Sequence, residues 1–250
     1  MSFHPIHHGL VDSTSERAFD SLRRGEARDG DLHVALGQTH GRGRLGRPWH
    51  SAPGEGLYAS LVHMPSAPGP QPAALPMAGA LALTDALDPE LAALGLERIE
   101  LDWPNDLVAA GAKLAGILVE TRGLEPARPH FVIGIGLNVS QRTFPRELLA
   151  ERPATSLALL GFETTPDRVL DLLLPQLEAR LSQARVDPEG LGHDYLTRTG
   201  MAGERVRVEL ADATFTGVLR SLSPTRGLGL QTLDCVREVP LGHVRGLAWP

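Results

Sequence analysis

Cysteine and long apolar segments are almost missing from this chain of 250 residues, and each absence excludes a class of protein. The single cysteine, Cys235, cannot close an intramolecular disulfide, which fits a reducing compartment. No apolar run reaches the roughly 18 residues of a transmembrane helix, and the N-terminus lacks the basic and apolar regions of a secretory signal. We therefore predict a cytoplasmic protein that has no contact with membranes.

Lysine is nearly absent as well, because Lys113 stands alone among 24 basic residues and arginine occupies the other 23. Acidic residues outnumber basic ones, and the formal net charge is −6. A nucleic-acid-binding protein is expected to carry a large basic surface, so we predict no binding to DNA. Hydrophobic residues make up 42% of the chain, which is enough to bury the core of one large domain and a small second one.

Three histidines, His4, His7 and His8, lie close together near the N-terminus. A zinc site would need further ligands, such as a cysteine pair or a second spaced group of histidines, and neither follows in the sequence. We interpret this segment as a flexible, polar N-terminus.

The stretch with the most informative composition is 41–49, which reads Gly-Arg-Gly-Arg-Leu-Gly-Arg-Pro-Trp. Its three glycines let backbone N–H groups come close to an anion, and its three arginines carry a charged fork that fits phosphate or carboxylate. We interpret this stretch as a local anion-binding loop. A solvated arginine-rich loop is the alternative when the stretch is taken alone.

The same glycines match the G-x-G-x-x-G fingerprint of dinucleotide-binding folds, which requires a helix directly after them. Pro48, Pro53 and Gly54 leave no room for such a helix. The Walker A phosphate-binding pattern fails too, because no Lys-Ser or Lys-Thr follows the glycines. The sequence therefore argues against both kinds of nucleotide site.

Apolar periodicity and turn residues divide the chain into an α/β part and a β-rich part, in which short, closely spaced strands predict a small barrel. Ser13 and Glu16 form a capping-box pattern at the start of the first helix, and Pro175 predicts a kink or two short helices within 166–185. We predict strands over 32–38, 57–62, 98–103, 107–109, 113–121, 131–139, 206–210, 215–222, 228–233 and 236–239, and helices over 13–24, 74–87, 166–185 and 190–198.

A second group of motifs lies in the middle of the chain, with Trp-Pro-Asn-Asp at 103–106 and Lys-Leu-Ala-Gly-Ile-Leu-Val-Glu at 113–120. Because every other basic position is arginine, the one lysine indicates that a compact ammonium is required at Lys113; survival of a single lysine by chance is the alternative. An ammonium on a flexible stem can follow a reacting oxyanion where a guanidinium does not fit. We predict that Lys113 lies over a reacting carboxylate and phosphate.

These motifs, together with Gly-Leu-Asn at 136–138, resemble those of the biotin protein ligases, and the similarity covers 12–138 in order. The resemblance implies an α/β (α+β) catalytic domain over 1–202, class II synthetase-like, with a mixed β-sheet backed by helices, and a small SH3-like β-barrel over 203–250. It also implies that biotin and MgATP react to give biotinyl-5′-AMP and pyrophosphate. A lysine of the biotin carboxyl carrier protein of a carboxylase then attacks the mixed anhydride.

The resemblance also assigns roles to residues. It implies that Lys113, Arg42 and Asp106 are catalytic, that Lys113 bridges the biotin carboxylate and the α-phosphate, and that Asp106 helps to place Mg²⁺ through the phosphates. The implied biotin-binding residues are Ser13, Thr14, Ser15, Gln38, Gly41, Arg42, Gly43, Arg44, Lys113 and Gly116. The implied ATP-binding residues are Arg42, Arg44, Arg47, Trp49, Asn105, Asp106, Lys113 and Asn138.

Two positions depart from the family pattern. The third residue of Ser-Thr-Asn is Ser15, so an amide contact is lost or replaced, and the basic residue that usually precedes Trp-Pro-Asn-Asp is Asp102. Some family members carry an N-terminal winged helix that binds DNA, but here the motif begins almost at once, at Ser13, and we expect none. The resemblance leaves a homodimer open.

Two alternative functions remain at this stage. A lipoate ligase or octanoyl transferase shares the fold, but would lack the Trp-Pro-Asn-Asp segment and the anion-binding loop over 41–49, called the arginine loop below. A non-catalytic biotin or nucleotide sensor would keep the pocket without turnover. Biotin-dependent release of pyrophosphate separates the sensor from an enzyme.

Overall fold

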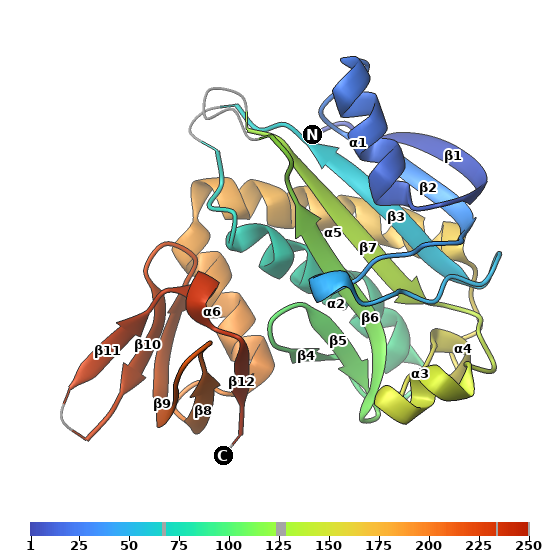
Figure 1. Cartoon of the computed structure of the whole chain (residues 1–250). Coiled ribbons are helices and arrows are strands. Elements are labelled where there is room, and N and C mark those ends of the chain that lie inside the picture. The colour runs from blue at the N-terminus through green and yellow to red at the C-terminus, as the bar shows by residue number, and fades with distance from the viewer. Residues whose placement is uncertain (67–68, 124–128, 234, 250) are drawn as a thin grey trace.

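The computed structural model describes 1–66, 69–123, 129–233 and 235–249. Its larger part is a seven-stranded sheet in the order β1-β2-β3-β7-β6-β5-β4 (Figure 1). Strands β1 and β2 are parallel and every other neighbouring pair is antiparallel, so the predicted mixed sheet is confirmed. The strands are β1 (His4–Val11), β2 (Asp31–Gln38), β3 (Gly56–His63), β4 (Glu100–Asp102), β5 (Asp106–Ala109), β6 (Ala112–Glu120) and β7 (Phe131–Asn138).

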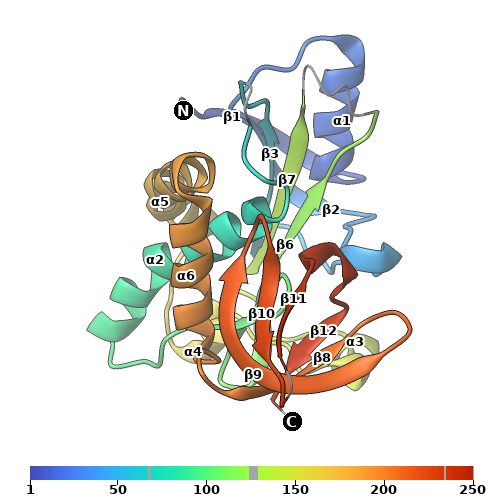
Figure 2. The ribbon, with the colours of Figure 1, turned by 90° about the vertical axis from the view of Figure 1, so that its left-hand side faces the viewer.

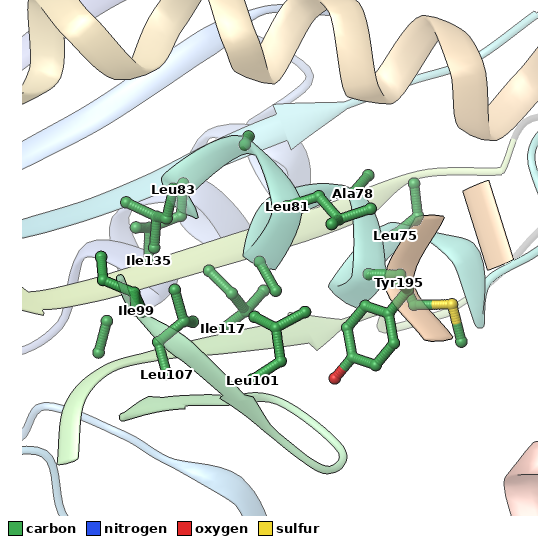
Figure 3. Packing of buried hydrophobic residues seen from close by; sticks show 14 of the residues in the cluster. Leu75, Ala78, Leu81, Leu83, Ile99, Leu101, Leu107, Ile117, Ile135 and Tyr195 are labelled. Carbon is green, nitrogen blue, oxygen red and sulfur yellow. The ribbon is translucent and has the colours of Figure 1, made fainter. Parts of the chain in front are cut away.

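Helices cover both faces of this sheet. Helix α1 (Thr14–Arg24) packs on β2, β3 and β7 from one side, and α2 (Ala74–Ala93) and α5 (Pro166–Val186) lie on the other (Figure 2). The main core forms between α2 and the strands, where Leu83 lies near Ile135 (Figure 3). Helix α6 (Pro188–Thr199) follows and closes one end of this core.

The two faces of β7 carry different residues, because successive side chains of a strand point to opposite sides. Ile133 and Ile135 belong to the main core, while Val132 packs with Phe19 of α1. Gly134 and Gly136 follow Val132 on the α1 side. The sheet therefore has a filled face toward α2 and an open, glycine-lined floor on the opposite face.

The C-terminal part is a five-stranded antiparallel sheet in the order β11-β10-β9-β8-β12. It packs on α6 (Figure 2), and a Cβ atom on Gly192 of α6 would lie 2.3 Å from the Leu222 carbonyl oxygen. The predicted β-rich C-terminal part is confirmed, and its boundary at residue 203 stays a prediction. The strands are β8 (Arg205–Glu209), β9 (Thr214–Ser223), β10 (Gly227–Gln231), β11 (Val236–Val239) and β12 (Gly246–Ala248).

The prediction of a flexible N-terminus is wrong. His4–Val11 form β1, which pairs in parallel with β2 from His4 opposite Asp31 to Val11 opposite Gln38. An edge strand is held by backbone hydrogen bonds on one side only, and most of its side chains are exposed. It therefore needs no apolar alternation, and this is why the sequence pattern missed it.

Two details of the predicted helices are also wrong. Ser13 is the N-cap of α1, but its side chain makes no capping hydrogen bond. Its amide donates to Asp12 (2.7 Å), and the Glu16 carboxylate pairs with Arg42 and Arg122, so no capping box forms. Helix α5 runs unbroken through Pro175, so the expectation of two short helices is wrong, and a kink at Pro175 stays a prediction. Pro175 is exposed while Leu173 and Leu177 are buried, so the one backbone hydrogen bond lost at the proline lies on the solvent side.

Three short elements have no signal in the sequence. These are α3 (Arg146–Glu151), α4 (Leu157–Leu160) and β12. Each is too short for hydrophobic periodicity to show. Within the described ranges, none of the helices has the length and apolar character required to cross a bilayer.

Candidate active site

A pocket of about 370 Å³ opens on the glycine-lined face of the sheet, between α1, the arginine loop and the end of α3. It brings together nearly all the residues predicted for the site. Those that line it are Ser13, Thr14, Ser15, Gln38, Arg42, Gly43, Arg44, Arg47, Trp49, Asn105, Asp106, Lys113, Gly116 and Asn138. Gly41 does not line it but lies behind it, where a Cβ atom would stand 2.5 Å from the Trp49 carbonyl oxygen.

One side of the pocket is a cluster of buried hydroxyl and amide groups. The Gln38 side chain accepts a hydrogen bond from the Thr14 amide (2.9 Å) and donates one to the Ser51 hydroxyl (2.8 Å). The Ser60 hydroxyl lies 2.8 Å from that of Thr14 and 3.1 Å from that of Ser15. Hydroxyl groups both donate and accept, so this cluster suits a neutral polar ligand such as a cyclic urea.

The arginine loop is closed on itself as a short hairpin. Arg42 bridges Pro48, the Gly43 amide donates to the Arg47 carbonyl (2.8 Å), and the Trp49 amide donates to the Gly41 carbonyl (2.8 Å). The turn is a short 3₁₀ segment over Arg44–Gly46, and it lies across β6 and β7 (Figure 1). All three arginines of the loop line the pocket.

Each of the first two arginines of the loop has a partner. Arg42 forms ion pairs of 2.8 Å with both Glu16 and Glu120. The pKa of Glu16 is lowered, mainly by the hydrogen bond from Arg122 and further by the charge of Arg42. Arg44 donates to the Asn105 side chain at 3.3 Å, and burial lowers the pKa of its guanidinium. Two carboxylates thus balance the charge of Arg42, while the guanidinium of Arg44 contacts a neutral amide.

Trp49 lies flat on the glycine floor. A Cβ atom on Gly136 would stand 2.6 Å from the indole ring, and one on Gly116 would stand 3.3 Å from it. The indole Nε1 is buried and has no hydrogen-bond partner among the described residues. Glycine at these positions thus lets an aromatic ring lie close to the sheet.

Lys113 and Asp106 meet at the opposite side of the pocket. The Lys113 ammonium is 2.7 Å from Asp106 Oδ2 and 5.3 Å from the centre of the Trp49 ring, within cation–π range. Arg152 donates to the same oxygen at 2.6 Å. The other oxygen, Asp106 Oδ1, is buried without a hydrogen-bond partner among the described residues. A buried carboxylate oxygen with no donor fits a ligand to a divalent cation held mainly by phosphates.

The two asparagines of the predicted site have structural partners. Asn105 donates to the Ile117 carbonyl at 3.0 Å, which ties the Trp-Pro-Asn-Asp segment to β6. Asn138 is 5% exposed and donates to the Thr155 carbonyl at 2.8 Å. Both side chains also line the pocket, and their contact with ATP stays a prediction.

Several pocket residues were missed by the sequence analysis, and Ser60, Arg152 and Arg245 are examples with polar or charged side chains. Ser60 lies in an apolar strand, and its inward direction follows only from the pairing of β3 with β7. Arg152 ends α3, and Arg245 comes from the C-terminal sheet, where its backbone amide donates to the Glu209 carbonyl. No local pattern marks any of the three, because long-range packing brings them to the pocket.

Comparisons with known proteins agree with this geometry. A family model described as "Biotin/lipoate A/B protein ligase family" matches residues 9–138. The chain is 40% identical to a biotin–[acetyl-CoA-carboxylase] ligase of Mycobacterium tuberculosis over 80% of its own length and 74% of that protein. It is 32% identical to a protein of the same name from Paracoccus denitrificans, over 94% of this chain and 97% of the other.

A solved structure is similar over almost the whole chain. It is the biotin protein ligase of Aquifex aeolicus in complex with biotin and ATP, with a TM-score of 0.77, 28% identity and coverage of 99% of both chains. The α/β sheet, the pocket and these similarities define a class of acyl-group ligases. The chain belongs to the biotin/lipoate A/B protein ligase family.

Proposed function

We propose that this protein is an ATP-dependent biotin protein ligase, which activates biotin as biotinyl-5′-AMP and then transfers it to a lysine of a carboxylase's biotin carboxyl carrier domain. One observation carries the proposal. The only lysine of the chain, Lys113, is paired with Asp106 and lies beside Trp49. It shares one pocket with the buried hydroxyl and amide cluster around Gln38. An acid-activating enzyme needs these two parts in one site.

The residues divide the first step between them. The cluster of Thr14, Ser60 and Gln38 binds the ureido ring of biotin, and its carboxylate extends toward Lys113. Attack of that carboxylate on the α-phosphorus of ATP forms the acyl–phosphate bond and breaks the bond to pyrophosphate. The Lys113 ammonium, with arginines of the loop, stabilises negative charge that grows on the phosphate oxygens.

Asp106 is the residue that would hold Mg²⁺, through Oδ1, while Oδ2 stays paired with Lys113 and Arg152. When bound, the ion neutralises charge on the phosphates. In the second step the carrier's lysine amine attacks the acyl carbon of biotinyl-5′-AMP. An amide bond forms, AMP leaves, and the amine loses its proton.

The experiment that tests the function combines the protein with biotin and MgATP. We expect biotinyl-5′-AMP by mass spectrometry and pyrophosphate in equal amount, and biotin on a lysine of an added carrier domain. Lipoate and octanoate serve as matched acids. Pyrophosphate release with lipoate but not with biotin would establish the acyl ligase alternative, and binding of biotin without pyrophosphate release would establish a sensor.

We expect 39–50 to become better protected when biotin binds. An anionic ligand competes with Glu16 and Glu120 for Arg42, and a loop that is closed only by a short bridge can open and reclose at low cost. Hydrogen exchange of backbone amides measures this, with α5 as an internal control that should not change. Equal protection of the loop with and without biotin would contradict the expectation.

DNA binding is expected to be undetectable at physiological salt. The net charge of −6 opposes approach to a polyanion, and nonspecific binding to DNA depends on neutralising phosphates with many basic residues. Gel retardation with a mixed set of duplexes, with biotin and MgATP present, is the measurement. Salt-sensitive retardation of any one duplex would overturn this part of the proposal.

A further inference from the structure

Arg152 lies in the pocket wall although it belongs to no motif of the sequence. Its guanidinium forms two short ion pairs from separate nitrogens, one of 2.6 Å to Asp106 and one of 2.6 Å to Asp102. One side chain from the end of α3 therefore joins the carboxylate of the Trp-Pro-Asn-Asp segment to the carboxylate that directly precedes it.

The backbone fixes Arg152 relative to Lys113. Arg152 is extended, with φ −160° and ψ 138°. Directly after it, Pro153 accepts a hydrogen bond from the Lys113 amide (2.9 Å), and the Thr155 amide donates to the Lys113 carbonyl (2.9 Å). These two hydrogen bonds hold 153–155, directly after Arg152, against β6. The same backbone bridge thus helps to place both cations.

Charge explains why position 152 matters. The basic residue expected before Trp-Pro-Asn-Asp is Asp102 here, and it adds a negative charge beside Asp106. Two carboxylates with Lys113 alone would repel the phosphates of a nucleotide, whereas Arg152 brings the group to two negative and two positive charges. A guanidinium has five N–H donors, and its two carboxylates occupy two of them. The side chain is 38% exposed, so the others are open to a ligand.

We propose that Arg152 binds the phosphates of ATP, with Asp102 as its positioning residue. This inference rests on the proposed function, because the nucleotide is the anion that the pocket would hold.

The test compares Arg152→Ala with two double variants. Isothermal titration calorimetry measures the Kd for MgATP and, separately, for biotin. Loss of a hydrogen bond to a charged group predicts that Arg152→Ala raises the Kd for MgATP at least about tenfold and leaves the Kd for biotin within about twofold of that of the unmodified protein. Asp102→Lys with Arg152→Ala returns the cation to position 102 and should recover most of the loss.

Asp102→Asn with Arg152→Ala distinguishes a contact from simple charge balance. It removes the repelling carboxylate without adding a cation, so its affinity for MgATP should stay as low as that of Arg152→Ala alone. If it recovers as well as the lysine variant, Arg152 only neutralises Asp102 and the proposal is wrong. The proposal also fails if Arg152→Ala keeps normal MgATP affinity, or if the lysine variant recovers nothing.

Controls separate other causes of weak binding. Arg142→Ala removes one positive charge from an exposed pair with Glu163 that does not line the pocket, so it should bind MgATP normally. Arg152→Gln repeats the test with a side chain that still reaches a carboxylate, and thermal unfolding confirms that each variant is folded. The proposed ligase function is judged independently, by biotinyl-5′-AMP formation in the unmodified protein. Its absence would reject that function while the MgATP titrations still report on Arg152.

Discussion

Lys113→Arg is expected to abolish almost all formation of biotinyl-5′-AMP while the protein stays folded. The Lys113 ammonium is enclosed by Asp106 and Trp49, and a Cβ atom on Gly116 would stand 3.6 Å from its Cε. A planar guanidinium is wider and presents its donors in a fixed fork, so it would displace the ring or the ligand. Loss of one preorganised donor at developing charge costs about 2.7 to 4 kcal/mol, or roughly 10² to 10³ in rate.

The measurement is single-turnover release of pyrophosphate at saturating biotin and ATP, with circular dichroism to check folding. Arg142→Lys is the matched control, because it exchanges the same two residue types at an exposed position outside the pocket. A Lys113→Arg rate within about threefold of the unmodified protein is a barrier change below about 0.7 kcal/mol. That result would mean that Lys113 only balances charge.

Local patterns predicted most of the fold, and long-range contacts account for what they missed. The alternation along Phe131–Asn138 and the turn at Ala110 and Gly111 specify β5, β6 and β7, because strand periodicity and positive φ are properties of the segment itself. By contrast, β1 depends on pairing with β2. A polar edge strand has no sequence signature apart from its partner.

The candidate site divides in the same way. Site residues such as Gln38 and Trp49 could be predicted because they belong to the short stretches of sequence that carry the family resemblance. Arg152 could not, since it is 46 residues from Asp106 and only the bridge to Lys113 brings it there. Its one sequence signal was indirect. Asp102 adds a negative charge next to the Trp-Pro-Asn-Asp segment, which favours a nearby cation. Nothing in the sequence indicated which of the 23 arginines supplies that cation.

Acidification from pH 7.5 to 4.5 is expected to destabilise this protein through a buried pair of histidines. His33 on β2 is 4% exposed, and its Nδ1 lies 3.0 Å from Nε2 of His8 on β1, with the rings stacked 5.3 Å apart. Burial, together with the charge on His8, lowers the pKa of His33 to about 4. Burial lowers the pKa of His8 as well. The folded pair is therefore neutral near pH 7.

The sign of the effect follows from proton binding. Above pH 6.5 neither the folded nor the unfolded chain protonates His33, and the full stability is present. Between pH 6.5 and about 4 the unfolded chain takes up a proton that the folded chain does not, so stability falls as the pH falls. The loss approaches about 3 kcal/mol at low pH, which is a large share of the 5 to 15 kcal/mol typical of a folded domain.

Urea unfolding at pH 7.5 and 4.5 measures this loss in the unmodified protein, in His33→Asn and in His4→Asn, whose histidine is exposed on β1. Carboxylates that titrate near pH 4 affect all three proteins alike, so the comparison isolates His33. The unmodified protein and His4→Asn should lose about 2 kcal/mol more than His33→Asn over this range. Equal losses in all three would show that His33 does not control acid stability.

Acidification should also weaken biotin binding before the whole chain unfolds. The strand that carries His33, β2, also carries Gln38, whose side chain accepts from the Thr14 amide of α1 in the pocket.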